Sequence, residues 1–218
     1  MEDDITGMNP THAKYEQLTV LGRGESSREY FEFTTAANER VFIMNFVSKD
    51  LAGRSIDKLS ESKVWVLGNI EEPVLKRRHI RRLSIERVFW AGLSTDPVRT
   101  RLRNRLNRYG RAVETLDNFM SMTEFQACRG TGILGLLIAA RAAQHVSVYG
   151  IDFYASGYTT QSLERGAGKE ATALRNAGPS IAASFNAVIS SSPNTMFSVY
   201  TRMPNWLDER ENIVIYPV

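Results

Sequence analysis

The sequence predicts an α/β domain in which a twisted, mainly parallel sheet is flanked by helices. Two segments carry this prediction. Residues 17–21 form an apolar strand that runs into a glycine turn and then into a helical pattern around Tyr30. Residues 131–143 form an apolar helix that leads directly into a second strand, 145–149. Strands that alternate with helices are typical of parallel sheets, because a helix returns the chain to the edge where the next strand begins.

The composition indicates one globular domain. The chain has 218 residues, of which 43% are apolar, and this is enough to build a sizeable core. We expect a polar lead-in over 1–15 and a single domain over 16–218. No apolar run is long enough to cross a bilayer and the first residues are acidic, unlike a signal peptide, so we expect a cytoplasmic protein. Cys128 is the single cysteine, and no Cys/His cluster indicates a metal site.

A basic segment lies between residues 76 and 111. It holds twelve Lys and Arg residues against two acidic ones, within a chain whose net charge is only +3. Such a segment favours an anionic partner: a sugar polymer, a membrane headgroup at the inner membrane face, or a nucleic acid. The spacing matches no nucleic-acid motif, so a nucleic acid is the least favoured of these. The alternative is that these residues are solvated helix faces, and the sequence leaves homo-oligomer formation open.

The turn after the strand 17–21 has the composition of a phosphate-binding loop. Gly22 and Gly24 permit a ligand to approach the backbone closely. Ser26 and Ser27 stand where a helix begins, so that the hydroxyl of one or the other can cap that helix. The third glycine of the dinucleotide fingerprint is missing, which argues against an NAD site. The turn therefore predicts a nucleotide-phosphate site that includes Gly22, Gly24 and Ser26.

Two asparagines follow the next two predicted strands. Asn45 comes directly after the strand 40–44, and Asn69 comes shortly after the strand 63–67. An amide offers both a hydrogen-bond donor and an acceptor to a sugar or a phosphate. The alternative is that asparagine merely ends these strands, as it commonly does.

Further elements are predicted in the middle of the chain and after residue 154. A strand is expected over 83–90 and a helix over 97–106, with the helical pattern resuming over 112–120. The stretch 155–178 is rich in Gly, Ser and Thr and is longer than most structureless connections, which is typical of a lid. After it we expect a helix over 179–190 that has proline in its first turn, a strand over 196–200, and an unplaced strand-like stretch over 213–216.

The start of the helix 131–143 and the exit of the strand 145–149 have the features of a ligand site. Gly130 and Gly132 at the helix start would let an anion reach exposed backbone N–H groups, and the helix dipole favours the negative charge. The strand exit, 150–154, would line the crevice at the carboxyl edge of the sheet. Asp152 in this exit could bind a metal ion or act as a catalytic base. Alternatively, it is a structural hydrogen-bond acceptor. The sequence has no D-x-D pair, which favours the structural interpretation.

Residues 129–154, RGTGILGLLIAARAAQHVSVYGIDFY, resemble the central motif of the bacterial sialyltransferases of glycosyltransferase family 42, which eukaryotic sialyltransferases distantly share. The resemblance implies a Rossmann-like fold, a variant of the GT-A type, with a small flexible lid over 155–178. In that family the first glycine turn typically reads G-N-G-P-S. Here Arg23 and Glu25 replace its asparagine and proline.

The resemblance also implies a donor site for a CMP-activated sugar, with no separate cofactor and no metal. Family members place asparagines after two strands in contact with the donor, which assigns this role to Asn45 and Asn69. A tyrosine of the lid binds the phosphate, and Tyr158 is the tyrosine within 155–178. The other implied contacts are those of Gly130, Thr131 and Gly132 with the nucleotide, of Tyr154 with the phosphate, and of Phe153 at the donor pocket. For Phe153, plain core packing is the favoured alternative.

The implied reaction transfers sialic acid or a related 2-keto sugar acid from its CMP conjugate to an acceptor, an anionic glycan or glycolipid that the segment 76–111 would attract. The family's base is a histidine just before the helix that follows the lid, and the corresponding positions here, 176–178, are Asn, Ala and Gly. His145 begins the central strand, away from the crevice. Two hypotheses follow: a transferase in which Tyr154 and Tyr158 serve the leaving group, or a non-catalytic protein that binds a nucleotide or an anionic glycan.

Overall fold

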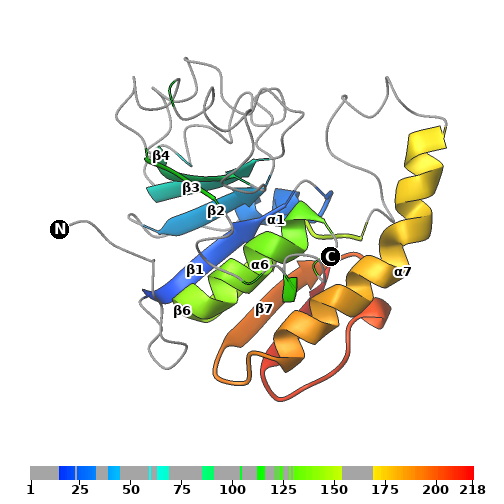
Figure 1. Cartoon of the computed structure of the whole chain (residues 1–218). Helices are drawn as coiled ribbons and strands as arrows, with labels where there is room; N and C mark the ends of the chain where they lie inside the picture. The colour runs from blue at the N-terminus through cyan, green and yellow to red at the C-terminus, as the bar shows by residue number, and fades with distance from the viewer. Residues whose placement is uncertain are drawn as a thin grey trace.

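The described part of the chain folds into a parallel sheet with helices packed against it (Figure 1). The computed structural model describes residues 15–22, 24–32, 39–44, 59, 63–68, 85–90, 104, 112–115, 121, 123–124, 128, 130–153 and 169–218. The elements follow one another in this order: β1 (Tyr15–Leu21), α1 (Ser27–Glu32), β2 (Arg40–Met44), β3 (Lys63–Gly68), β4 (Ile85–Trp90), β5 (Ala112–Thr115), α6 (Thr131–Ala142), β6 (Ala143–Tyr149), α7 (Lys169–Ser190), β7 (Met196–Thr201), the 3₁₀ turn η3 (Pro204–Trp206) and β8 (Ile213–Pro217). The predicted α/β class is confirmed.

The order of the strands places β1 at the centre of the architecture. The described strands form an eight-stranded sheet in the order β5-β4-β3-β2-β1-β6-β7-β8, and the neighbouring strands pair in parallel. The chain winds outward from β1 to β5, and α6 then brings it back to the other side of β1. The direction of winding therefore reverses between β1 and β6, and the carboxyl ends of these two strands flank the topological switch point, where open α/β sheets bind ligands.

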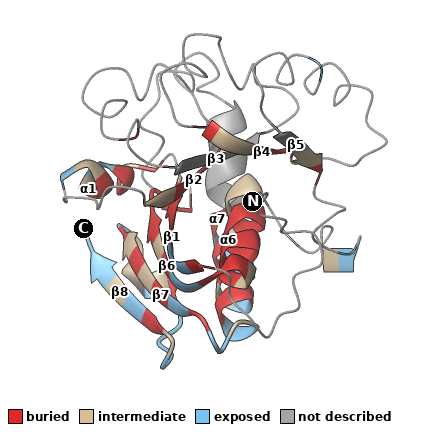
Figure 2. Ribbon diagram, turned by 90° about the vertical axis from the view of Figure 1, so that its left-hand side faces the viewer, coloured by how far each residue is buried: buried red, intermediate tan, exposed pale blue. Residues whose placement is uncertain are grey.

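Helix α6 forms the centre of the core. All residues from Ile133 to Ala140 are buried, as Figure 2 shows by its almost uniform colour. A helix that is apolar on every side must be covered on every side, and α6 packs on β1, β2 and β6 while α7 covers its flank. Helix α1 lies on the opposite face of the sheet, where Tyr30 contacts Tyr149 with ring centroids 5.6 Å apart.

A ladder of tyrosines crosses β6, β7 and β8 on the face of α1. Tyr149, Tyr200 and Tyr216 are register partners, and their rings stack with centroids 4.3 and 4.5 Å apart. Burial, followed by the hydrogen bond with Tyr200, raises the pKa of the Tyr149 hydroxyl above its ordinary value, so Tyr149 stays neutral at physiological pH. The ladder runs from the buried Tyr149 to Tyr216, which is 39% exposed on the edge strand.

The edge strand β8 offers few donors for pairing with another strand. The N–H of Val218 donates to the carbonyl of Thr201 on β7, 3.3 Å away. In a parallel ladder the backbone groups of successive residues point to opposite sides, so those of Ile215 and Pro217 point away from β7. Proline has no N–H group to donate. An edge that ends in this way resists strand addition.

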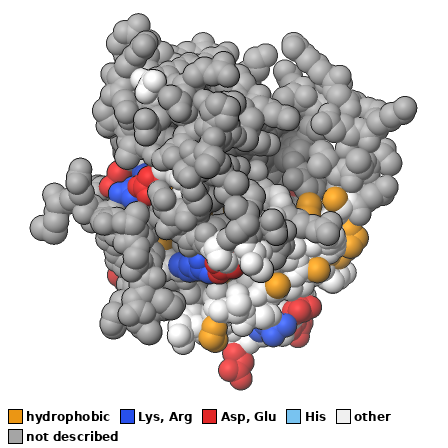
Figure 3. Space-filling view, in the orientation of Figure 1, with side chains coloured by type: hydrophobic (Ala, Val, Ile, Leu, Met, Phe, Trp, Pro, Cys, Tyr) orange, Lys and Arg blue, Asp and Glu red, His pale blue; other side chains and the backbone are white. Residues whose placement is uncertain are grey.

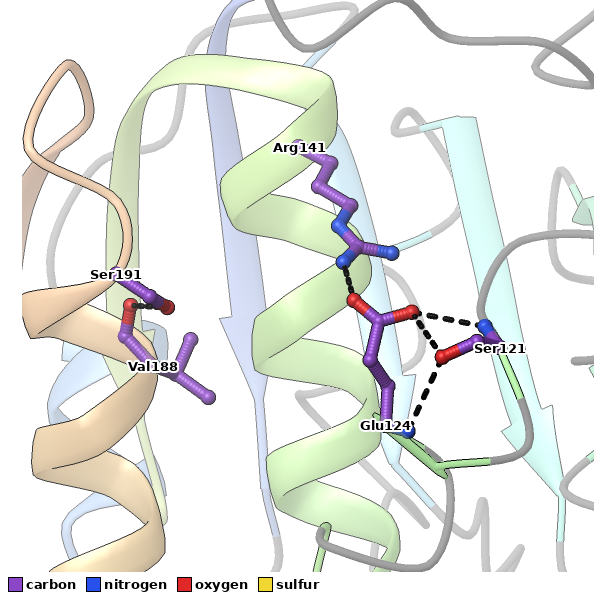
Figure 4. Close-up of polar contacts among 5 residues, drawn as sticks. All are labelled: Ser121, Glu124, Arg141, Val188 and Ser191. Carbon is purple, nitrogen blue, oxygen red and sulfur yellow. Dashed lines mark hydrogen bonds and ion pairs between the residues drawn. The ribbon is translucent and has the colours of Figure 1, made fainter.

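A cleft of about 800 Å³ lies between α6 and α7, toward the amino edge of the sheet. Glu124 at its rim forms an ion pair with Arg141 of α6 and accepts hydrogen bonds from the backbone N–H and the hydroxyl of Ser121, 2.8 and 3.0 Å away (Figure 4). The bond from the Ser121 backbone is the main reason that the pKa of Glu124 lies below its ordinary value. Thr195 reaches from the far side to the carbonyl of Ala140, 2.9 Å away.

Two sequence predictions about elements are corrected, and one strand that the sequence left unplaced is assigned a position. Helix α7 begins at Lys169 rather than at 179, so the second part of the predicted lid is helical and Pro179 stands inside the helix, where one backbone hydrogen bond is lost. Residues 112–115 form the strand β5 rather than a helix, because they pair with β4. The unplaced stretch 213–216 is the edge strand β8. The remainder of the predicted lid, 155–168, lies outside the described residues.

Candidate functional site

Three loops converge at the carboxyl edge of the sheet, after β1, β6 and β7. The pairing of β1 with β6 sets Leu21 beside Tyr149, and the chain keeps the two strands together beyond their ends. The N–H of Gly22 donates to the carbonyl of Tyr149, and the N–H of Gly24 donates to the carbonyl of Gly150, each at 2.7 Å. The predicted glycine turn and the predicted strand exit thus lie against each other at the switch point.

The glycines of the first turn are required by this packing. A Cβ on Gly22 would overlap the carbonyl of Gly150, and a Cβ on Gly24 would overlap the carboxylate of Asp152. Gly150 itself has φ 71°, a conformation that favours glycine. The glycines at these positions therefore serve the contact between the two loops, whatever else approaches their backbone.

Asp152 holds the three loops together. The residue is buried, with 2% of its surface exposed. One oxygen, Oδ2, accepts a hydrogen bond from the backbone N–H of Ser26 at 2.8 Å. The other, Oδ1, accepts one from the backbone N–H of Arg202 at 3.2 Å and a longer one from the Thr201 hydroxyl at 3.4 Å. The structural interpretation of Asp152 is confirmed, and the described residues contain no group of acidic, His or Cys side chains suited to a metal ion.

Ser26 points into the protein. It is 1% exposed, and its hydroxyl oxygen accepts a hydrogen bond from the N–H of Gly150 at 2.9 Å. Through this bond and that of its own N–H to Asp152, Ser26 joins the loop after β1 to the loop after β6. A contact of the Ser26 hydroxyl with a phosphate stays a prediction, and its present partner is the protein backbone.

The second predicted glycine turn lies beside the first. Gly130 is exposed with φ 92° and caps α6, and Thr131 and Gly132 form the first turn of that helix. A Cβ on Gly132 would lie 3.6 Å from the Ile151 side chain, and a Cβ on Gly22 would lie 3.2 Å from the same side chain. Ile151 therefore packs between the two turns. The structure brings together two backbone segments that the sequence separates by more than a hundred residues.

Phe153 belongs to the core. It is 2% exposed, packs edge to face on Phe185 at 5.4 Å between ring centroids, and lies 6.0 Å from the ring of Trp206. Its backbone has φ 50°, which is unusual for a residue other than glycine and bends the chain away from β6. This placement favours packing over ligand contact.

The positions that correspond to the family's base fall in α7. Gly178 is buried, and a Cβ there would lie 2.6 Å from the carbonyl oxygen of Phe153 and 2.8 Å from the Trp206 ring. Position 178 therefore has no room for a histidine. His145 is exposed near the start of β6, four residues and about 13 Å before the carboxyl end of that strand.

Four of the predicted site residues, Asn45, Asn69, Tyr154 and Tyr158, lie outside the described residues. So does most of the basic segment 76–111. Its Arg87 is described and forms an ion pair with Glu114 of β5. On the face that Figure 3 shows, the described basic side chains lie next to acidic ones and form no large field of one sign.

The fold matches a known structure. No family model matches the chain, and no curated protein matches it significantly. The structure of the sialyltransferase CstII from Campylobacter jejuni in complex with a substrate analogue, cytidine-5'-monophosphate, aligns with 92% of this chain and 87% of its own, with a TM-score of 0.59 and 14% identity. This chain has a sialyltransferase-like fold. At this level of identity the likeness establishes the architecture, including the Rossmann-like parallel sheet.

One charged contact joins two of the site's loops within the sialyltransferase-like fold and could not be predicted from the sequence. Glu25, in the loop after β1, forms an ion pair with Arg202, in the loop after β7. Glu25 stands where the family that the sequence resembles typically has proline. This difference is the one feature of the sequence that could have singled out Glu25. Its partner could not be found from the sequence, because the two residues meet only when β6 lies between their strands.

Proposed function

We propose that this protein is a glycosyltransferase that transfers sialic acid or a related 2-keto sugar acid from a CMP-activated donor to an acceptor glycan. One observation carries the proposal: two glycine turns meet around Ile151 at the switch point of a sheet whose solved counterpart is a sialyltransferase complexed with CMP. Either part alone would be weak, since glycine turns also serve packing and a fold serves many functions. Together they support a site for a nucleotide-sized ligand at the carboxyl edge between β1 and β6.

The first turn of α6 suits the phosphate of such a donor. The helix begins at Thr131 after the exposed Gly130, and the positive end of its dipole faces the switch point. An anion there is stabilised by the N–H groups of the first turn without a metal ion. In the proposed reaction Tyr154 and Tyr158 donate hydrogen bonds to the departing phosphate, and Asn45 and Asn69 hold the donor.

A second function is favoured by the packing at Gly178. Inverting transfer needs a base for the acceptor proton, and the backbone of Phe153 fills the space that a side chain at 178 would take. A protein that binds a CMP-sugar or an anionic glycan without transferring it fits this observation. The two candidates share the nucleotide site and differ in turnover.

Calorimetric titration of the purified protein with CMP, UMP, GMP and AMP tests the shared site. We expect selective binding of CMP that is weakened by Asn45→Ala and by Tyr158→Phe. The matched control is Asn194→Ala, because Asn194 is exposed and lies before β7, at the opposite edge of the sheet from the switch point. Absence of binding to any nucleotide would refute the proposal.

Release of CMP from CMP-sialic acid, with and without acceptor glycans, then separates the two candidates. Acceptor-dependent release identifies a transferase. Selective CMP binding without release, under any acceptor tested, identifies the binding protein.

A further inference from the structure

Arg202 and Glu25 form an ion pair that spans the exit of β6. Glu25 follows the first glycine turn, directly after Gly24, and Arg202 follows β7. Because β6 lies between β1 and β7, the two side chains meet across the loop that contains Asp152. They are partly exposed, with 44% of the Arg202 side chain and 27% of the Glu25 side chain accessible to solvent.

The backbones on both sides of this pair are held independently of the pair. Asp152 accepts a hydrogen bond from the N–H of Arg202 at 3.2 Å and another from the N–H of Ser26, the residue after Glu25, at 2.8 Å. The loops therefore keep their positions when the ion pair opens. Only the two side chains have to move.

The charges at this edge explain why the pair would open. In the described parts of the three loops, at 22, 24–26, 150–153 and 201–203, Arg202 is the basic residue, and Glu25 and Asp152 are the acidic ones. A phosphate that enters here meets the partly exposed carboxylate of Glu25, with the buried carboxylate of Asp152 behind it, unless a cation turns toward the phosphate. A guanidinium binds a phosphate with two parallel hydrogen bonds. Free CMP, the ligand that the transfer releases, is a phosphate monoester and carries more charge than one carboxylate.

We propose that Arg202 binds the nucleotide phosphate and that Glu25 is its internal counter-ion, which the phosphate displaces. The inference rests on the proposed nucleotide site and adds a specificity residue to it. The exchange is easy because an exposed ion pair is weak and is screened by salt. Glu25 thus lowers the affinity for phosphate-bearing ligands and leaves the affinity for uncharged ones unchanged.

This arrangement predicts opposite effects for the two halves of the pair. Glu25→Gln frees the guanidinium and should tighten CMP binding by up to about fivefold, the range expected for one exposed ion pair. Arg202→Gln removes the cation and should weaken CMP binding by about fivefold or more. Cytidine, which lacks the phosphate, should bind each variant as it binds the wild-type protein. A purely structural ion pair would lose stability in both variants and would not separate CMP from cytidine.

Calorimetry with CMP and cytidine on both single variants and on the double variant tests the inference. The ion pair of Asp208 with Arg210 is the matched control, since it is also exposed, and Asp208→Asn and Arg210→Gln should leave CMP binding unchanged. Thermal unfolding verifies that each variant is folded, and Arg202→Lys, which keeps the charge, should lose less affinity than Arg202→Gln.

The outcomes distinguish this inference from the proposed function. Opposite shifts for CMP with constant cytidine affinity support it. If CMP binds the wild-type protein and the two variants shift its affinity in the same direction or not at all, the role of Arg202 is wrong while the nucleotide site stands. If the wild-type protein binds no CMP, both are wrong.

Discussion

Asp152→Ala should destabilise the protein strongly, because the carboxylate joins three loops in a buried position. The change leaves two backbone donors, the N–H groups of Ser26 and Arg202, without their acceptor. A hydrogen bond to a charged group contributes about 1.5–3 kcal/mol. Discounting the longer Thr201 contact and the partial exposure at Arg202, we expect a loss of about 3–5 kcal/mol in the free energy of unfolding. That is a large part of the ~5–15 kcal/mol by which a domain is stable.

The free energy of unfolding of Asp152→Asn should lie between those of the wild-type protein and Asp152→Ala. The amide keeps one acceptor oxygen and replaces the other by an NH₂ group, so one of the two N–H donors then faces another donor. We expect about half the loss, ~2 kcal/mol. Urea unfolding monitored by circular dichroism measures the free energy of unfolding of both variants, and an unchanged m-value shows that the difference is one of stability. Asp208→Ala is the control because its side chain is 55% exposed, and it should change stability by less than about 0.5 kcal/mol. A loss below about 1 kcal/mol for Asp152→Ala would show that the loops are held by other contacts.

Two further predictions concern the packing at Gly178 and the ionisation of Cys128, which lines the cleft between α6 and α7. Gly178→Ala should destabilise by about 1–3 kcal/mol despite alanine's higher helix propensity, because its Cβ would lie 2.6 Å from the Phe153 carbonyl; thermal unfolding measures this. Burial, and then the charge of Glu124, raises the pKa of the Cys128 thiol above its ordinary value. Alkylation of folded Cys128 by iodoacetamide should therefore begin at higher pH than in the unfolded chain, and Glu124→Gln should move the profile back toward lower pH.

Each of these predictions has a control on the same molecule. Ser190→Ala, at an exposed position of α7, should leave the melting temperature nearly unchanged. A Gly178→Ala variant as stable as the wild-type protein would mean that α7 moves freely away from Phe153. For Cys128, the profile in denaturant supplies the reference, and an alkylation rate that Glu124→Gln leaves unaltered at every pH would contradict the electrostatic cause.

The sequence predicts those parts of the candidate site that can be recognised within a single segment. Gly22, Gly24, Gly130 and Gly132 stand next to strand and helix signals, and the structure brings both turns to the switch point. The sequence did not reveal that the first pair of glycines packs on the exit of β6. That contact depends on the pairing of β1 with β6 and so exists only in the folded sheet.

The sequence by itself determined the elements whose periodicity is local. The helix 131–143 and the strands at 40–44, 145–149 and 196–200 fall within two residues of α6, β2, β6 and β7, because side chains a few residues apart define them. The sequence pattern did not predict that α7 begins before Pro179, nor that 112–115 form a strand. Tertiary packing and strand pairing overrode the local signals at both places.

Only the tertiary structure decided what joins the loops of the site. The hydrogen bond from Ser26 to Asp152 connects residues 126 positions apart, and the ion pair of Glu25 with Arg202 spans a still longer separation. No local pattern encodes such contacts, since each residue looks like an ordinary polar loop residue in its own segment. They follow from the strand order, which sets β6 between β1 and β7 and brings the three carboxyl ends together.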